Sequence, residues 1–575
     1  MHRWRFLSIL MTLGLVLAAC GGGSSPTPSA SASAASLPPF TATSYPTAGP
    51  ADCKAPADSK HDAYTGEFKQ IKAIDRYTVE FDLCGSDIAF LSKVAFSAFP
   101  INDTAYLEAH SKDKSIVQVP NGTGPYFLKE WVKGDHITLQ ANPDYWGPKA
   151  KNQTVILKWS TESAQRLVQL QSGPPDGADG IDNPGKGDLA AISADTNLKL
   201  YPREGLNTLY LGMNILDKPW DNEKVRQAIA MGIDRDRIVK NFFPPGSEVA
   251  THFVPCSIKF ACGGDDWYTY DPVAAKKLLA EAGFPNGFTT KVQYRNVDRA
   301  YAPNVPILAQ EIQSQLKNNL GITATIDEQE SGTYIDNNTA GKLPGLFMLG
   351  WLIDYPDMTD WMDYHFGAGS GAKFGKPFAD IAAAITTGAT KTADADREAA
   401  YTLANNLIKQ HVPMVPIAHA GSATAFRADV VGAHSSPLTN ENFNVMQPGD
   451  RNTLVFVQGA EPLGLFCPDE TDGESLRTCL QINDSLYGFE VAGTKPIPAL
   501  ATSCTSNPDF SVWTCTLRQG VKFHLGGVLD ANDVVESYAV SWDADNPLHV
   551  GRSGAFDYFP GLFGGFLNPP IPKPS

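Results

Sequence analysis

The chain has 575 residues, of which 43% are hydrophobic, and its formal net charge is −16. This length and apolar content predict a folded protein with more than one lobe. An acidic surface repels phosphate backbones, so the composition argues against a nucleic-acid partner.

The N-terminal leader has the features of an export signal. Arg3 and Arg5 precede an apolar run over residues 6–19, which is shorter than the roughly 20 residues a helix needs to cross a bilayer. The sequence Leu-Ala-Ala-Cys that ends this leader resembles a lipobox. We expect residues 1–20 to be a lipoprotein signal peptide with the lipid on Cys20; a plain cleaved signal is the alternative. The Gly-, Ser- and Pro-rich residues 21–50 favour a disordered tether.

Eight cysteines remain after Cys20, and an exported chain meets an oxidising compartment in which cysteines form disulfides. Cys504 and Cys515 flank the turn sequence SNPD, which predicts a disulfide across a hairpin. Cys256 and Cys262 close the short loop PCSIKFAC. Elimination leaves two further candidate pairs, Cys467 with Cys479 and Cys53 with Cys84. Zinc is the competing interpretation, but there is no C-x-x-C pair and the spacings fit no zinc pattern well.

Three long segments follow in the middle of the chain. Residues 121–147 alternate as two strands about a Lys-Gly-Asp turn. Residues 209–243 predict a strand, an Asp221 cap and an amphipathic helix. Residues 270–288 predict a capped helix that ends at Gly283. Together these segments resemble the large substrate-binding proteins of ABC importers, the family with dipeptide-, oligopeptide- and nickel-binding members.

The resemblance implies an α/β fold of the two-lobed periplasmic-binding-protein type, with an extra subdomain on the first lobe and a hinge between the lobes. Such proteins catalyse no reaction. They capture a solute outside the cell and deliver it to a membrane permease, and a lipid anchor with a flexible tether suits that role. We expect a monomer with no cofactor that contacts the membrane only through its lipid.

The order of the segments departs from the family. Its usual start, a strand with a G-x-E-P motif, then P-A-L-A, then K-F-H-x-G and D-V-x-x-S, stands here at 453–538, near the C-terminus. There, Asp530 with Asp533 predicts a capped helix beginning near Ala531. The strand that usually follows stands at 71–83, right behind the tether. The chain resembles a circular permutant, which is tolerated where new termini fall in exposed loops; a broken tandem array is the alternative.

This interpretation predicts seven segments. They are, in order, a signal peptide (1–20), a tether (21–50), the second part of the extra subdomain (51–150), lobe I (151–264), lobe II (265–425), a return to lobe I (426–485) and the first part of the extra subdomain (486–575).

The strongest candidate site is LGWLIDYPDMTDWMDYHF at residues 349–366. A buried strand is followed by a W-x-x-D-Y arrangement of Trp351, Asp354 and Tyr355. In oligopeptide-binding members the Asp of this motif accepts the α-ammonium of the peptide, so the resemblance implies that role for Asp354. A carboxylate in a closing cleft makes a strong charge-assisted bond because water leaves. Trp351 would supply a flat apolar wall.

Peptide binders of this family also pair the ligand backbone as an extra strand between the lobes. The resemblance places Thr471, Asp472 and Gly473 along one edge, and the stretch from Gly350 to Leu352 along the other. For Asp472-Gly473 an ordinary turn is the alternative. Oligopeptide binders can also place a basic residue just before that buried strand to meet the peptide carboxylate, but the corresponding run here, GLFMLG, is wholly apolar.

Other interpretations of the same residues are weaker. Asp357, Asp360 and Asp363 lack the order of a calcium loop and are expected on the solvated face of a short helix. His365 is the only histidine near the proposed cleft, so no metal is expected. There is no G-x-S-x-G or H-E-x-x-H motif, which argues against a secreted hydrolase. An oligosaccharide-binding member of the family and a sensory or scaffold lipoprotein remain as alternatives to peptide import.

Overall fold

The structure is a computed structural model that describes residues 39–53, 64, 66–297 and 299–569. The chain divides into two compact units, Met1–Phe40 and Thr41–Ser575, and the description concerns the second. Cys20 and its leader lie outside the described residues. The second unit is a two-lobed α/β fold built on three large sheets. Among the described residues, no helix has both the length and the apolar character that a membrane span requires.

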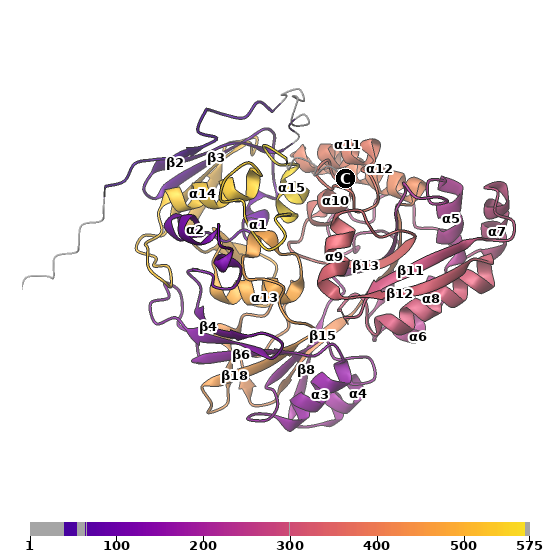
Figure 1. Cartoon of the computed structure of the whole chain (residues 1–575), viewed down its shortest axis with the longest axis horizontal. Helices are drawn as coiled ribbons and strands as arrows, with labels where there is room; N and C mark the ends of the chain where they lie inside the picture. Colours follow the sequence, from indigo (N-terminus) through magenta and orange to yellow (C-terminus); the bar gives the residue numbers. More distant parts are fainter. Residues whose placement is uncertain (1–38, 54–63, 65, 298, 570–575) are drawn as a thin grey trace, which may run out of the picture. The chain divides into compact units, whose positions relative to one another are not determined.

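A five-stranded sheet brings together strands from the two ends of this unit (Figure 1). Its strand order is β1 (Ser44–Tyr45), β2 (Phe68–Asp75), β3 (Thr78–Leu83), β22 (Val512–Leu517) and β21 (Ala501–Ser506). Helix α14 (Ala531–Trp542) packs on β2 and β3, with the rings of Tyr538 and Phe68 5.9 Å apart. Helix α14, late in the chain, is therefore covered by strands from the front of the chain, as the sequence predicted.

Lobe I is centred on a seven-stranded sheet. Its order is β4 (Tyr126–Val132), β5 (His136–Ala141), β6 (Thr154–Trp159), β18 (Thr453–Gln458), β7 (Gly180–Asp182), β15 (Ser422–Arg427) and β8 (Leu198–Arg203). Strand β18 runs parallel to both neighbours. One face packs against α3 (Ser163–Ser172) and α4 (Leu189–Ala194), and the other against Ile482 of α13 (Gly473–Ile482). Burial on both faces explains the continuous apolar run of β18.

Lobe II is centred on a six-stranded sheet in the order β10 (Glu248–Val249), β14 (Met414–His419), β9 (Asn207–Met213), β13 (Leu346–Leu352), β11 (Thr289–Arg295) and β12 (Thr323–Gln329). β11 and β13 are parallel neighbours, so their carboxyl ends meet at one edge of the sheet. The helices of this lobe are α5 (Glu223–Gly232), α6 (Arg235–Phe242), α7 (Pro272–Glu281), α8 (Val305–Leu320), α9 (Ser331–Thr339), α10 (Met358–Phe366), α11 (Ala379–Thr390) and α12 (Asp394–His411).

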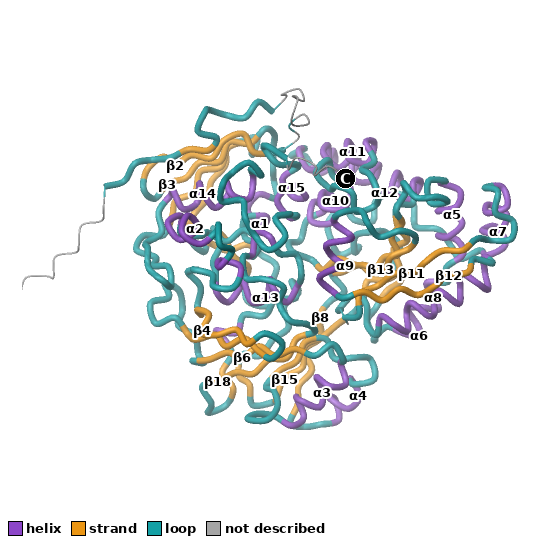
Figure 2. Tube along the Cα trace, viewed as in Figure 1, coloured by secondary structure: helices purple, strands orange, loops and turns teal. Residues whose placement is uncertain are grey.

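Short elements connect these sheets, and loops are frequent between them (Figure 2). They are α1 (Phe90–Lys93), α2 (Thr104–His110), η1 (Ser115–Val117), β16 (Val430–Val431), η2 (Phe443–Val445), β17 (Gln447–Pro448), η3 (Cys467–Asp469), β19 (Tyr487–Phe489), β20 (Pro496–Pro498) and α15 (Tyr558–Phe563).

The chain crosses between the seven- and six-stranded sheets at residues 204–206 and 420–421. Asn207 ties the crossings together: its amide nitrogen donates to the Ala420 carbonyl (2.7 Å) and its amide oxygen accepts from the Ala420 nitrogen (2.9 Å). The first crossing lies well before residue 264, where the sequence placed it, because β9 pairs with the distant β13 and β14. Strands β4 and β5 likewise join the lobe I sheet rather than the extra subdomain expected for residues 51–150.

Most local predictions are confirmed. β4 and β5 form a hairpin about Gly134, whose φ of +78° suits a glycine turn. Asp530 and Asp533 form a capping box at the start of α14. The cap of α5 is corrected: Asn222, not Asp221, accepts a hydrogen bond from the Lys224 nitrogen (3.0 Å).

The structure contains the four expected disulfides, which are Cys53–Cys84, Cys256–Cys262, Cys467–Cys479 and Cys504–Cys515. The last of these lies across the β21–β22 hairpin. The tether, expected to reach residue 50, is shorter. Strand β1 pairs with β2, and the Thr43 nitrogen donates to Asn532 of α14 (3.0 Å), so residues from about 43 onward belong to the fold.

Candidate functional site

The W-x-x-D-Y segment begins with Trp351 among the last residues of β13, a central strand of lobe II, and continues into the loop after Leu352. Its conformation is fixed by Asp360 of α10. One carboxylate oxygen of Asp360 accepts the indole N–H of Trp351 (3.1 Å), and the other accepts the backbone N–H of Asp354 (3.0 Å). Asp360 is fully buried, so both bonds are protected from water. The expectation of a solvated acidic helix face is therefore wrong.

The other two acids of that helix region are also engaged or buried. Asp357 caps α10 through the Thr359 nitrogen (3.1 Å) and forms an ion pair with Arg397 of α12 (2.9 Å). Asp363 is only 7% exposed. Helix α10 packs against α11 and α15, and every residue from Met358 to Phe366 is buried.

Asp354 has a buried carboxylate that a cationic group of a ligand could bind. It is 8% exposed, and within the described part of the chain its Oδ2 has no hydrogen-bond partner. Burial, and next the charge of Asp360, raise the pKa of Asp354 well above its ordinary value, while a hydrogen bond from Tyr558 acts against the rise. A ligand ammonium would supply the missing partner and favour the ionised form.

A cavity of about 70 Å³ lies beside this carboxylate, with walls from both lobes. Lobe II contributes residues of β9, β11, α9, β13 and α10. Lobe I contributes the 439–440 loop and the start of α13, and Tyr558 comes from α15. Six of the predicted ligand residues line it, namely Gly350, Trp351, Leu352, Asp354, Thr471 and Gly473. The two predicted edges are thus brought together across one cavity.

Two predicted residues are not in the cavity wall. Tyr355 is fully buried and does not line the cavity. Asp472 turns its carboxylate to the start of α13, where it accepts from the Ser475 nitrogen (3.0 Å) as the helix N-cap. Burial, followed by the charge of Glu474, raises the pKa of Asp472. Asp472-Gly473 is therefore a helix start rather than a simple turn.

Sequence reasoning missed two arginines that line the same cavity, Arg295 and Arg299. Arg295 ends β11 and donates to Tyr301 (3.1 Å) and Ser331 (3.2 Å). Arg299 is 6% exposed and forms an ion pair with Glu474 of α13. In each guanidinium the Nε has no partner among the described residues. The sequence YRNVDRAY, with two arginines at and after the end of a strand, could have indicated these residues. Their place at the site follows only from the parallel pairing of β11 with β13.

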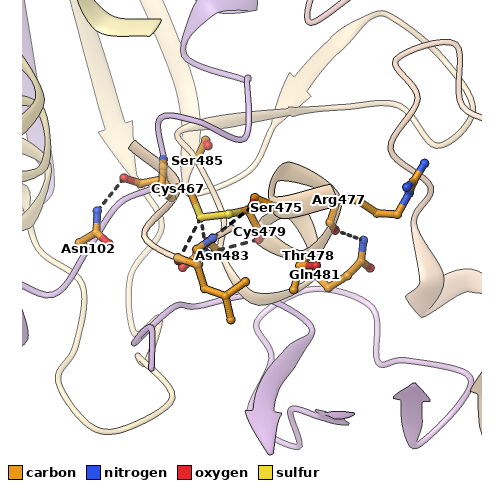
Figure 3. The surroundings of a disulfide bond; sticks show 12 residues. Asn102, Cys467, Ser475, Arg477, Thr478, Cys479, Gln481, Asn483 and Ser485 are labelled. Atoms are coloured by element: carbon orange, nitrogen blue, oxygen red, sulfur yellow. Dashed lines mark hydrogen bonds between the residues drawn. A yellow bond between two sulfur atoms is a disulfide. The ribbon is translucent and has the colours of Figure 1, made fainter. Parts of the chain in front are cut away.

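A disulfide ties the loop before α13 to that helix. Figure 3 shows Cys467 of η3 joined to Cys479 of α13, with the Asn483 amide donating to the Cys467 sulfur (3.2 Å) and to the Cys479 carbonyl (3.3 Å). This bridge closes the segment that carries Thr471 and Gly473. It therefore restricts the motion of the lobe I edge of the cavity.

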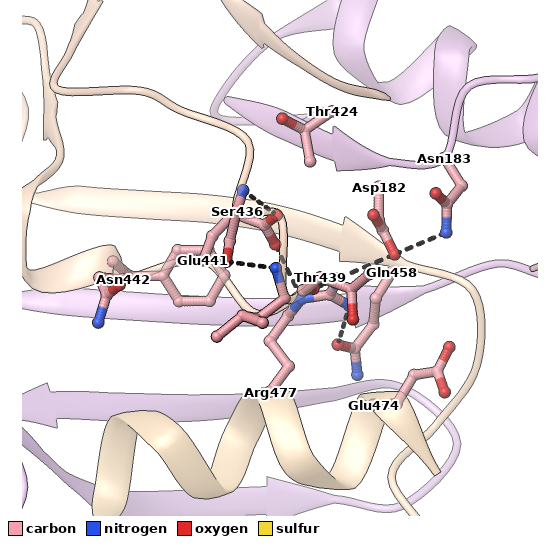
Figure 4. Close-up of polar contacts among 12 residues, drawn as sticks. Asp182, Asn183, Thr424, Ser436, Thr439, Glu441, Asn442, Gln458, Glu474 and Arg477 are labelled. Atoms are coloured by element: carbon pink, nitrogen blue, oxygen red, sulfur yellow. Dashed lines mark hydrogen bonds and ion pairs between the residues drawn. The ribbon is translucent and has the colours of Figure 1, made fainter. Parts of the chain in front are cut away.

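A buried ionic network fixes the other face of α13. Figure 4 shows Arg477 between Asp182 and Glu441, at 2.9 Å and 3.2 Å, with its Nη2 also donating to the Thr439 carbonyl (2.7 Å). Arg203 pairs with Glu441 on the far side (2.6 Å). Burial acts to raise the pKa of Asp182, but the guanidinium groups outweigh it and lower that pKa. The network anchors the 439–440 loop, which lines the cavity.

His365 lines the cavity as a neutral aromatic group. Burial lowers its pKa to about 3, and its Nδ1 lies 2.7 Å from the Trp361 carbonyl. Its ring is 4.8 Å from that of Trp351. Among the described residues, the one cluster with metal-ligand spacing is His252 with Cys256 and Cys262, and both cysteines are in a disulfide.

Comparison with known proteins shows which family the sequence resembles. The sequence matches the family model of bacterial extracellular solute-binding proteins, family 5 Middle, over residues 32–373 and 495–556. A dipeptide-binding protein of Pseudomonas aeruginosa is 30% identical over 389 residues, which cover 65% of this chain and 70% of that protein. Heme-binding protein A of Haemophilus influenzae is 26% identical, over 65% of this chain and 69% of its own.

Solved structures show the same similarity. The ABC transporter-associated periplasmic binding protein DppA from Helicobacter pylori, in complex with the peptide STSA, superposes with a TM-score of 0.61 at 25% identity, over 66% of this chain and 74% of that one. A dipeptide-binding protein from Pseudoalteromonas in complex with Met-Leu also gives a TM-score of 0.61, at 24% identity.

Proposed function

Because this chain belongs to the bacterial extracellular solute-binding proteins of family 5, which are transport receptors and not enzymes, we propose that it is the short-peptide receptor of an ABC importer. The observation that carries this proposal is that side chains of opposite charge line one cavity. Asp354 and Arg299 line the same walls, and each keeps a buried polar atom without a partner among the described residues.

A short zwitterionic peptide has two groups that could bond to these unpartnered atoms, although Arg299 also pairs with Glu474. Its α-ammonium would donate to the Asp354 carboxylate, and its carboxylate would accept from the Nε of Arg299 or Arg295. Charge-assisted bonds in a site without water are the strong ones. The apolar run GLFMLG at 345–350, which lies mostly within β13 and has no basic residue, is then no obstacle, because the neighbouring strand β11 supplies the cation. The peptide ligands named for the similar proteins support the same class.

The cavity in this structure is smaller than the 300–1,000 Å³ typical of small-molecule sites, so peptide entry requires the lobes to separate. The crossings at 204–206 and 420–421 are the places for such a hinge. The peptide backbone would lie between Gly350 and Leu352 on one side and Thr471 to Gly473 on the other.

Isothermal titration with three ligands tests the proposal. Ala-Ala has both charged ends, N-acetyl-Ala-Ala lacks the ammonium and Ala-Ala-amide lacks the carboxylate. We expect Ala-Ala to bind and each blocked peptide to bind at least about tenfold more weakly, since one charged hydrogen bond contributes about 1.5–3 kcal/mol. Equal affinities for all three would remove the charge-pair role. If an oligosaccharide binds and no peptide does, the ligand is an oligosaccharide and the peptide proposal is wrong.

The delivery step and the anchor are part of the same proposal. The full-length protein would be held at the outer face of the cell membrane by a lipid on Cys20 and would pass its peptide to permease subunits. Cell fractionation of the wild type and Cys20→Ala tests the anchor: the variant should move from the membrane fraction to the soluble one. An unchanged membrane fraction would contradict lipid attachment at Cys20.

We also propose that the chain is a circular permutant of the family. The family model matches two separate blocks, and the late strand β18 lies between β6 and β7 in the lobe I sheet. In the five-stranded sheet the late β22 pairs with the early β3. The Glu67 nitrogen donates to the Phe563 carbonyl (2.7 Å), so the two ends that the usual order would connect lie side by side.

A further inference from the structure

A second cavity, of about 340 Å³, adjoins the charge-pair site and has no role so far. Two residues, Asp354 and Asn440, line both cavities. The second cavity is enclosed by lobe I, the extra subdomain and the β19–β20 hairpin, and Arg295 and Arg299 are not in its wall. It is therefore reached from the ammonium end of the proposed ligand and not from the carboxylate end.

The wall of this cavity is mainly apolar. Its large side chains include Phe96, Trp146, Leu438, Leu480, Phe489 and Ile497. Trp146 is held in place: its indole donates to Asp484 (2.8 Å), which also accepts from the hydroxyls of Tyr145 (3.3 Å) and Thr123 (2.9 Å). A fixed aromatic wall of this kind fits a large apolar group better than water or an ion.

Two residues that line this cavity have a buried polar atom without a hydrogen-bond partner among the described residues. Ser97 Oγ and Asn440 Oδ1 are buried and have no partner in the described part of the chain. Asn440 lines both cavities, so its Oδ1 is a candidate acceptor for an N–H of the ligand main chain. An apolar cavity with a small number of placed polar groups is the usual form of a specificity pocket.

We propose that this cavity receives the side chain of the first residue of the bound peptide and that the protein selects peptides with a large apolar or aromatic N-terminal residue. The inference rests on the proposed peptide binding. The α-ammonium and the first side chain leave the same Cα atom, so an ammonium on Asp354 puts that side chain at the mouth of the second cavity. The rest of the peptide continues toward Arg299 in the first cavity.

Titration calorimetry with paired dipeptides tests this selectivity. Phe-Ala and Ala-Phe have equal composition, and Ala-Ala is the reference. We expect Phe-Ala to bind about tenfold to one hundredfold more tightly than Ala-Ala, as burial of a Phe side chain contributes about 1.5–3 kcal/mol. Ala-Phe should stay within about threefold of Ala-Ala, a difference of less than about 0.7 kcal/mol.

Variants that fill the cavity make the test specific. Ala499 and Ile497 line only the second cavity, and Ile497 is 37% exposed, so Ile497→Trp should leave the fold intact. Ala499→Phe and Ile497→Trp should remove the Phe-Ala advantage and leave Ala-Ala affinity unchanged. Ile74→Trp on β2, at a residue that is 52% exposed and lines neither cavity, is the matched control and should change nothing.

The outcomes separate the two proposals. If Ala-Ala binds but Phe-Ala has no advantage, or if Ala499→Phe and Ile497→Trp weaken both peptides equally, the first-residue pocket is wrong and the peptide receptor stands. If no dipeptide binds the folded wild type, both proposals fail.

Discussion

The indole N–H of Trp351 donates to the buried carboxylate of Asp360, at 3.1 Å. The second oxygen of the same carboxylate accepts the backbone N–H of Asp354. One acid of α10 therefore positions two predicted ligand residues, Trp351 and Asp354. Asp360 touches neither cavity and acts through the residues it positions.

Asp360→Ala should therefore damage binding and stability together. It leaves the buried Trp351 indole and the Asp354 N–H without acceptors, at a cost of about 1–3 kcal/mol for each unsatisfied group. We expect a lower melting temperature and a Kd for Ala-Ala raised at least about tenfold, since loss of about 1.4 kcal/mol of binding energy is tenfold. Asp360→Asn keeps an acceptor for one donor and should recover part of both. A variant that melts earlier but binds normally would show that Asp360 has only a structural role.

Ligand binding should release a proton from the site. Burial, with Asp360 next, raises the pKa of Asp354 well above its ordinary value in the unliganded protein. An approaching ammonium favours the ionised carboxylate and lowers that pKa, so at a pH below the raised value a proton must leave. Calorimetry in two buffers that take up protons with different heats, repeated at a series of pH values, should give different binding enthalpies wherever the pH lies below the raised pKa. Identical enthalpies in the two buffers would contradict an ammonium on a protonated Asp354.

A second group makes stability depend on pH. Burial, opposed by the charge of Lys93, raises the pKa of Glu67 from 4.5 to about 7, and Asp87 and Asp363 are the acids near the same lysine. A raised pKa means that the folded state holds the proton more tightly, so the contribution is complete below about pH 4.5 and is lost as the pH rises through about 7. The Glu67 side chain is 26% exposed, so we expect a shallow slope.

Thermal melts between pH 4.5 and 7.5 check this. The melting temperature of the wild type should fall as the pH rises, and Glu67→Gln should reduce the fall, because glutamine keeps an acceptor for Lys93 but does not titrate. Glu398→Gln, at an exposed site on α12, is the control and should keep the wild-type slope. A Glu67→Gln slope as steep as that of the wild type would assign the pH dependence to other groups.

The proposed permutation predicts that this chain will also fold when its segments are rearranged into the usual family order. A rearranged protein would begin at Arg451, join residue 569 to residue 41 through a flexible Gly/Ser linker, and end at Gln447, within the turn region at 448–450. We expect cooperative unfolding within a few degrees of the wild type and unchanged ligand affinity. A chain that stays unfolded would show that the connection through Pro448 to Asp450 is required. The same linker inserted between Pro448 and Gly449 of the original chain controls for local damage.

Prediction from the sequence succeeded where local chemistry determines structure. The Asp530–Asp533 capping box, the β4–β5 hairpin and the Cys504–Cys515 pair depend on residues close in the chain, and the structure has all three. The covering of α14 by β2 and β3 was predicted from the order of motifs, which carries long-range information.

Apart from the α5 cap, which was misplaced by one residue, the failures at the site and at the lobe boundary are long-range. The acids of α10 were expected in solvent because their partners Trp351 and Arg397 lie on other elements. Arg299 was missed because its place at the site follows from the pairing of β11 with β13, not from the residues beside Asp354. The boundary between the lobes was misplaced for the same reason, since β9 joins a sheet whose other strands come much later.

The central claim is that Asp354 binds a ligand ammonium, and calorimetric titration of Ala-Ala into Asp354→Asn tests it most directly. The account predicts a Kd raised at least about tenfold, from the loss of a charged hydrogen bond of about 1.5–3 kcal/mol, with a melting temperature equal to or above that of the wild type because no ion pair is broken. Asp363→Asn removes another buried acid of this region outside the cavity and should bind normally. Wild-type affinity for Ala-Ala in Asp354→Asn would contradict the account.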